Sequence, residues 1–261
     1  YGEMTLTVGL TALLLAPEVF WPLRRVGAAF HSAQDGKTAV EAAFQFIDAA
    51  DPPPSGARYV RAPLTVQVDD PDLSARPGRV TVLTGPNGIG KSTLLQAILG
   101  MGPGRIAVNG IDVAELDLPR WWSQVAWLAQ RPVLVPGTVL ANLELFGPLP
   151  DLRQACRDAA FDDVVAELPD GLDTVLGRGG VGLSLGQRQR LGLARVLGSA
   201  APVLLLDEPT AHLDGPTEDR VLRAIAHRAS RGATVLVVGH RDPVLAIGDV
   251  VVSMGAAHVP Q

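Results

Sequence analysis

The chain has 261 residues, of which 47% are apolar, with 22 lysines plus arginines against 27 aspartates plus glutamates and a single cysteine. This apolar share excludes an intrinsically disordered chain, and one cysteine cannot form an internal disulfide. The net charge of -5 weighs against a dedicated nucleic-acid binder, which would usually be basic. Only two of the cations are lysines, Lys37 and Lys91, so a position that keeps lysine is of interest.

The N-terminal segment is uncharged from residue 4 to residue 15, and Trp21 and Arg24 follow it. Tryptophan and arginine beside an apolar run are typical of a cytoplasmic membrane interface, although a run this short also suits a buried helix. We interpret residues 1–50 as the last transmembrane helix and its cytoplasmic extension, in a chain that begins within a longer protein. The prolines of residues 51–57 cannot continue a helix and predict a linker.

Residues 58–261 alternate short β-branched runs with helical patterns. This alternation predicts an α/β domain built on a largely parallel sheet. The expected strands are residues 79–84, 125–129, 203–206, 234–238 and 250–252.

A glycine-rich segment follows the first expected strand and fits the pattern G-x-x-x-x-G-K-[ST]. Glycines let backbone amides curl around an anion, and the N-terminus of the helix expected at residues 92–99 adds a favourable partial charge. Lys91 would reach the β- and γ-phosphates of a nucleotide, whereas the simpler alternative is a glycine-rich turn before a helix. The predicted phosphate loop consists of Gly85, Pro86, Asn87, Gly88, Ile89, Gly90, Lys91, Ser92 and Thr93.

Two adjacent carboxylates, Asp207 and Glu208, end the apolar strand that begins at residue 203. Neighbouring residues on a strand point to opposite faces, so the two acids would do different jobs. The first can hold Mg²⁺ through water, and the second can orient or deprotonate an attacking water. Alone, such a pair is usually a solvated strand end; beside a phosphate loop it is the expected acidic partner.

Residues 183–190 (LSLGQRQR) resemble the signature of ATP-binding cassette (ABC) ATPases, usually LSGGQ followed by a basic helix. The other elements of that family follow in order: Gln130 resembles the Q-loop glutamine, residues 211–214 (AHLD) the D-loop, and His240 the switch histidine. The resemblance extends over residues 60–254. It implies a P-loop NTPase of ABC type, with a mainly parallel sheet core and a helical subdomain, that binds and hydrolyses ATP.

The resemblance also implies a partner, because two ATPase domains of this family pair head to tail. Each ATP then lies between the phosphate loop of one chain and the signature of the other. Ser184, Gly186 and Gln187 would serve the nucleotide held by the partner, and Asp214 would report across the interface. Ser184 alone has an ordinary explanation as the N-cap of the basic helix.

Catalysis and cofactor binding are implied for the remaining residues. Glu208 would act on the attacking water, and His240 with Gln130 would sense the γ-phosphate. The implied cofactors are ATP and Mg²⁺. The expected Mg²⁺ ligands are Ser92, Gln130 and Asp207.

Three departures from the family pattern stand out. Leu185 replaces the first signature glycine, so a side chain crowds a position of close approach. Arg178 stands where many exporters have glutamate, which would alter contact with a membrane domain. No aromatic residue occurs between Val60 and Gly85, where an adenine-stacking tyrosine is expected, and Tyr59 is one candidate substitute.

The N-terminal segment narrows the resemblance to exporters of cysteine or glutathione that serve cytochrome bd assembly, which work as heterodimers in the plasma membrane. An apolar third signature residue suits one half of such a pair. This implies membrane lipid, a second half-transporter and a small thiol as partners, and no nucleic acid. The alternatives are an exporter of lipid or peptide, a soluble ABC ATPase of DNA repair or translation, and an assembly module that binds ATP with little turnover.

Overall fold

The computed structural model describes residues 56–255, all of which fall in one compact unit of the chain. The transmembrane end predicted at residues 1–50, and most of the linker predicted at residues 51–57, lie outside the described residues. Among the helices of residues 56–255, none is long and apolar enough to cross a membrane.

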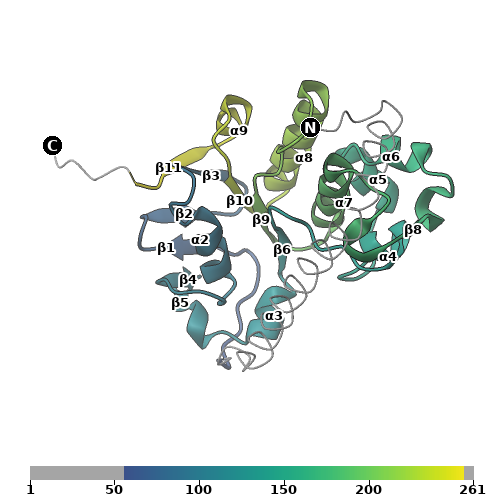
Figure 1. Cartoon of the computed structure of the whole chain (residues 1–261). Coiled ribbons are helices and arrows are strands. Elements are labelled where there is room, and N and C mark those ends of the chain that lie inside the picture. Colours follow the sequence, from purple (N-terminus) through teal and green to yellow (C-terminus); the bar gives the residue numbers. More distant parts are fainter. Residues whose placement is uncertain (1–55, 256–261) are drawn as a thin grey trace, which may run out of the picture. The chain divides into compact units, whose positions relative to one another are not determined.

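A five-stranded sheet forms the centre of this unit, with the order β11-β3-β10-β9-β6 (Figure 1). Every neighbouring pair in this sheet is parallel, so the predicted parallel core is confirmed. Each strand begins and ends within one residue of its expected bounds. The strands are β3 (Val80–Thr84), β6 (Val125–Leu128), β9 (Val203–Asp207), β10 (Thr234–Val238) and β11 (Val250–Ser253).

The central strands are buried on both faces, which explains their continuous apolar sequences. Along β10, Val235 and Val237 belong to one hydrophobic cluster, whereas Leu236 and Val238 belong to another. Successive side chains of a strand point to opposite faces, so the two clusters lie on opposite sides of the sheet. The first cluster includes residues of the two long helices, and the second includes the helix that follows the phosphate loop.

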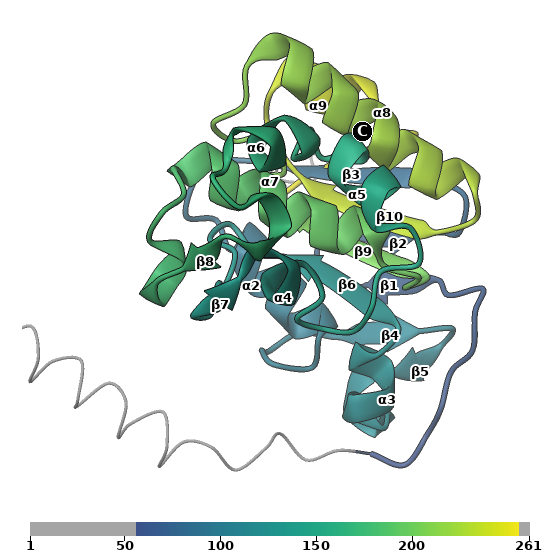
Figure 2. The same ribbon diagram turned by 90° about the vertical axis from the view of Figure 1, so that its right-hand side faces the viewer.

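Helices cover both faces of the sheet: α7 and α8 (Figure 2) pack on one face within the first cluster, and α2 packs on the other face within the second. The shorter helices α4, α5 and α6 gather beside α7 and make the predicted helical part of the domain (Figure 1). The helices are α2 (Lys91–Ile98), α3 (Leu118–Trp122), α4 (Val139–Leu143), α5 (Leu152–Asp158), α6 (Asp162–Glu167), α7 (Leu185–Gly198), α8 (Gly215–Ser230) and α9 (Asp242–Ala246). Short 3-10 helices occur at Val113–Glu115, Gly171–Asp173 and Arg178–Gly180.

A second sheet, antiparallel and in the order β2-β1-β4-β5, was not among the predicted elements. Its strands have two or three residues each, too few to show a period in the sequence. It packs over α2 through the cluster that also contains Leu236. Its strands are β1 (Val66–Val68), β2 (Leu73–Ala75), β4 (Ile106–Val108) and β5 (Ile111–Asp112); a separate two-stranded ladder joins β7 (Gly137–Thr138) to β8 (Val175–Leu176).

Candidate active site

The phosphate loop connects β3 to α2 at the carboxyl edge of the central sheet. Gly85, Gly88 and Gly90 have φ values of 143°, 78° and 105°, which side-chain-bearing residues rarely adopt. A Cβ added to Gly85 would also lie 2.7 Å from the carbonyl oxygen of Met254. Gly90 is the N-cap of α2 and makes no side-chain cap bond. The start of α2 therefore has the backbone of an anion site.

Lys91 lies inside this loop. The side chain is 7% exposed, and Nζ donates to the carbonyl oxygens of Gly85 at 2.8 Å and Pro86 at 2.9 Å. An ammonium group has three donors, so one remains for a phosphate oxygen even while both carbonyls are bound. The loop and its lysine thus present a positive charge where a nucleotide phosphate would lie.

Asp207 ends β9 beside the start of α2 and is 4% exposed. Burial raises the pKa of Asp207 above its ordinary value and the charge of Glu208 adds to this, while a hydrogen bond with Ser92 and the charge of Lys91 act in the opposite direction. The Ser92 hydroxyl and the Asp207 carboxylate are the hard oxygen ligands that Mg²⁺ prefers. Within residues 56–255, no group of three or more His, Cys, Asp or Glu side chains could hold a metal by itself. This pair therefore fits a cation that shares its coordination with phosphates and water.

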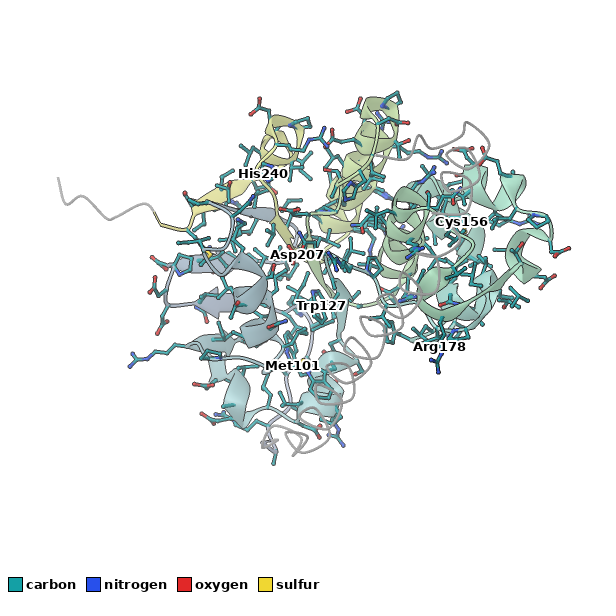
Figure 3. All side chains as sticks on the ribbon, in the orientation of Figure 1. Met101, Trp127, Cys156, Arg178, Asp207 and His240 are labelled. Carbon is teal, nitrogen blue, oxygen red and sulfur yellow. The ribbon has the colours of Figure 1, made fainter. Side chains whose placement is uncertain are left out.

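Side chains from three separate motifs meet at Glu208. Oε2 accepts from Nε2 of Gln130 at 3.4 Å, and Oε1 lies 3.8 Å from Nδ1 of His240. Glu208 has a φ of 48°, and a left-handed conformation of this kind costs roughly 1 kcal/mol or more in a residue with a Cβ. Its N–H donates to the carbonyl oxygen of Val238 at 3.0 Å, so β10 holds the strained residue in place. In Figure 3, Asp207 and His240 are labelled near this edge of the sheet, whereas Cys156 is labelled in the helical part of the domain.

Gln189 contributes to this group although the sequence analysis gave it no role. It lies on α7, is 3% exposed, and its Nε2 donates to the backbone carbonyl oxygen of Glu208 at 3.4 Å. The bond connects the signature helix to the strained glutamate. A buried glutamine on a basic helix was the available signal, but its partner is 19 residues away and on another element.

The signature residues begin α7. Ser184 is its N-cap, as expected, and forms a capping box: Oγ accepts from the Gln187 N–H at 3.2 Å, and Gln187 Oε1 accepts from the Ser184 N–H at 2.8 Å. Gly186 lies close to the D-loop, because a Cβ added there would be 3.4 Å from the His212 carbonyl oxygen. Leu185 is 52% exposed. Among residues 56–255, no hydrogen bond joins these signature residues to the phosphate loop.

Asp214 is the N-cap of α8, where its carboxylate accepts from the Thr217 N–H at 2.9 Å. Hydrogen bonds from the side chain and then the backbone of Thr217 lower the pKa of Asp214. The exposed carboxylate therefore favours its ionised form, and its bond to Thr217 fixes the end of the D-loop. A role at an interface remains a prediction.

Tyr59 lies near the C-terminal end of α2, whereas the phosphate loop lies at the N-terminal end of that helix. The guanidinium carbons of Arg61 and Arg120 lie over its ring, at 5.6 and 5.8 Å from the centroid. Arg120 belongs to α3, which contacts the C-terminal end of α2 through a bond from Trp121 Nε1 to the Ile98 carbonyl oxygen. The phosphate loop is at the other end of α2, so this geometry does not favour Tyr59 as the adenine-stacking residue.

Comparison with known proteins places these motifs in one family. A family model described as ABC transporter matches residues 68–211. The chain is 33% identical over 270 residues to the glutathione/L-cysteine transport system ATP-binding/permease protein CydD of Escherichia coli, covering 95% of the chain and 46% of that protein. It is 36% identical over 253 residues to the ATP-dependent lipid A-core flippase of Burkholderia orbicola, covering 88% of the chain and 42% of that protein.

A solved structure of a bacterial Atm1-family ABC exporter with ATP bound has a similar fold, with a TM-score of 0.69 and 27% sequence identity, covering 97% of the chain and 48% of that exporter. The chain spans less than half the length of each of these relatives. The family match covers more than half of the chain and includes the phosphate loop, the signature and the strand that ends in Asp207. The chain therefore belongs to the ABC transporter family and carries the ATPase domain of that ATP-hydrolysing family.

Proposed function

We propose that this chain binds ATP with Mg²⁺ at the phosphate loop and hydrolyses it to power export of a small substrate, as part of a longer membrane protein. The observation that carries the proposal is the meeting of Glu208, Gln130 and His240 beside the buried Asp207 and Lys91. Few arrangements other than nucleotide hydrolysis use an anion loop, a Mg²⁺ carboxylate and a second, partly exposed carboxylate together.

In this proposal each side chain has a separate task. Lys91 and the loop amides hold the β- and γ-phosphates, and Ser92, Asp207 and Gln130 would hold Mg²⁺, which when bound neutralises phosphate charge. Glu208 orients the attacking water and accepts its proton. His240, 3.8 Å from Glu208, contacts the γ-phosphate. Hydrolysis then changes the charge next to His240, which is how the domain would sense the state of its nucleotide.

We further propose that the chain works head to tail with a second ATPase domain, in a heterodimeric half-transporter pair. The start of α7 supports this, because Leu185 is exposed and the signature makes no hydrogen bond to its own phosphate loop within residues 56–255. Ser184, Gly186 and Gln187 would then complete the site of the partner, and Asp214 would lie at the shared interface. The helix terminus would add positive potential at the partner's γ-phosphate.

An apolar groove supports docking of a membrane domain. It has a volume of about 750 Å³, and aromatic side chains line it together with Met101 and Arg195. Phe146 in this groove is 79% exposed, and the buried Nε1 of Trp127 has no hydrogen-bond partner within the described residues. Met101 and Trp127 are labelled in Figure 3. We propose that a cytoplasmic loop of the membrane domain occupies this groove, since the relatives are more than twice as long as this chain. The aromatic side chains that line the groove are Trp122, Trp127 and Phe146.

The proposed substrate is a small thiol, cysteine or glutathione, moved across the plasma membrane for cytochrome bd assembly. The segment around residues 15–24 and the apolar residue Leu185 support this choice. Lipid export is a second candidate because a lipid A-core flippase is 36% identical to the chain. The net charge of -5 argues against a nucleic-acid partner and thus against a soluble ABC ATPase of DNA repair.

The decisive experiment for hydrolysis is Glu208→Gln in the full-length protein, purified with its partner half. We expect ATP binding to stay within about twofold while turnover at this site falls about 1000-fold, because the amide cannot accept the proton from water. Glu115→Gln is the matched control, since the Glu115 side chain forms an exposed ion pair with Arg58, on a different element from the phosphate loop and Glu208. Full turnover of Glu208→Gln when the partner site is inactivated would overturn the role.

Substrate choice is tested in everted vesicles that contain both halves. We expect ATP to drive uptake of labelled cysteine or glutathione, and the Glu208→Gln protein to abolish it. Translocation of fluorescent lipid without thiol uptake would transfer the assignment to lipid export.

A further inference from the structure

Arg241 connects the switch histidine to the D-loop, two parts of the site that are far apart in the sequence. It follows His240 directly, and its NH2 nitrogen lies 2.9 Å from Oε2 of Glu218 in the first turn of α8. Its NH1 nitrogen donates to the backbone carbonyl oxygen of Thr210 at 3.3 Å. One guanidinium group therefore holds both ends of the segment that contains Asp214, and it also adjoins the switch histidine.

Glu218 depends on this contact. It is only 3% exposed, and its other oxygen, Oε1, has no hydrogen-bond partner within residues 56–255. Burial of a carboxylate is costly unless the charge is paired, and Arg241 is the cation that pairs with it. Arg241 itself is 45% exposed, so the ion pair lies where α8 reaches the surface. The D-loop would lose its anchor if the pair broke.

Unusual backbone occurs within the segment that Arg241 spans and just before it. His212, inside the segment, has a φ of 64°, and Glu208, two residues before Thr210, has a φ of 48°. Strained residues of this kind keep their conformation only when surrounding contacts hold them. The bonds from Arg241 to Thr210 and Glu218 are such contacts.

We propose that Arg241 and Glu218 are positioning residues that hold His240 and the D-loop in one arrangement, so that the state of the γ-phosphate at His240 is transmitted to Asp214. The proposal rests on the site roles given under the proposed function. It predicts that the pair affects ATP turnover rather than ATP binding. Within residues 56–255, the bonds of these two side chains go to each other and to Thr210, not to the phosphate loop.

The test measures ATP turnover and nucleotide binding of Arg241→Gln in the full-length protein with its partner half. We expect kcat to fall at least 10-fold while KM for ATP stays within twofold. Arg220→Gln is the matched control, because Arg220 forms a similar ion pair that involves α8: it lies on that helix and pairs with Asp162 of α6 at 2.8 Å. Its kcat is expected to stay within twofold of the parent.

A double substitution separates positioning from a general loss of structure. If Arg241 acts through His240, His240→Ala with Arg241→Gln is no slower than His240→Ala alone, whereas independent effects multiply. Multiplying effects, or a kcat of Arg241→Gln within twofold of the parent, would overturn the proposal. If Arg241→Gln binds less than one nucleotide per site, the variant is misfolded and Arg241→Lys replaces it, again with KM for ATP within twofold of the parent. A kcat of Arg241→Lys that falls more than threefold supports the proposal, and a smaller fall overturns it. A fully active Glu208→Gln protein would instead refute the proposed function.

Discussion

The starts of α2 and α7 are both candidate phosphate sites, but the two helices treat their first amides in opposite ways. Gly90 caps α2 without any side-chain bond, and Lys91 supplies a positive charge directly inside the loop. At α7, Ser184 and Gln187 already bind each other's backbone amides in a capping box. The start of α2 is therefore open toward a ligand, whereas the start of α7 is satisfied by its own side chains.

This difference separates a site that binds a nucleotide by itself, at α2, from a site that completes the binding of a nucleotide held elsewhere, at α7. An anion at α2 meets free backbone donors and a lysine, so it can bind to this chain alone. An anion at α7 must use the remaining donors or displace a cap worth about 1 kcal/mol. We infer that α7 contributes to a nucleotide already held by the other domain. Four substitutions test this comparison.

Lys91→Ala should have the largest effect, since it removes the charge from the open end. We expect affinity for ATP to fall at least 100-fold, about 3 kcal/mol, as measured by titration with a fluorescent nucleotide. Lys91→Arg should also bind poorly, because the broad planar guanidinium does not fit where Nζ contacts two loop carbonyls. Tight binding by Lys91→Ala would show that the loop backbone suffices.

Asp207→Asn removes the acid that faces the start of α2. Turnover should fall about 100-fold with loss of a Mg²⁺ ligand, yet the apo protein should melt at a higher temperature. The sign follows from the raised pKa: ionised Asp207 opposes folding at pH values above its folded pKa, and this penalty disappears as the pH falls through that value. Melting curves of the apo proteins at pH 7.5 and pH 4 check this sign. A gain in melting temperature on Asp207→Asn that is equal at both pH values would contradict burial of the charge as the cause.

Ser184→Ala opens the capped helix. It should lower the melting temperature by about 2–4 °C, as expected for a loss of about 1 kcal/mol. Thr138→Ala is the matched control, because Thr138 caps α4 with a similar bond of 3.0 Å to the Ala141 N–H. Only Ser184→Ala should also slow the partner's site, by about fivefold, when this chain carries Glu208→Gln. Equal turnover of the two cap variants would limit Ser184 to a structural role.

Leu185→Gly should have the smallest effect. It restores the family glycine and removes an exposed side chain from the helix start. We expect turnover at the partner's site to rise about two- to threefold, with a stability cost of up to about 1 kcal/mol. Unchanged turnover would show that Leu185 does not crowd the composite site.

The central sheet could be predicted because its strands are continuous apolar runs buried on both faces. The order of the strands could not, since β3 pairs with β10 and β11, which follow it by more than 140 residues. The antiparallel sheet escaped prediction for another reason. Strands such as Val66–Val68 are shorter than any window in which alternation can be recognised.

The candidate site divides in the same way. Linear patterns predicted the loop around Lys91 and the acids after β9, because backbone chemistry requires these residues in sequence order. Gln189 and the pair of Arg241 with Glu218 were missed, since each contact joins residues about 20 positions apart that share no spacing rule. Tyr59 was a candidate on sequence proximity alone, and its arginine neighbours show why proximity was not enough.

The contact between Gly85 and Met254 has a consequence for biosynthesis. Both neighbours of β3 in the sheet come from residues 234–253, and Met254 donates its N–H to Thr84 at the entrance of the phosphate loop. A ribosome therefore makes the lysine of the loop long before it makes the strands that shape the loop. A nascent chain cannot capture nucleotide at this site until residues up to Met254 have emerged, so ATP binding reports that the central sheet has been completed.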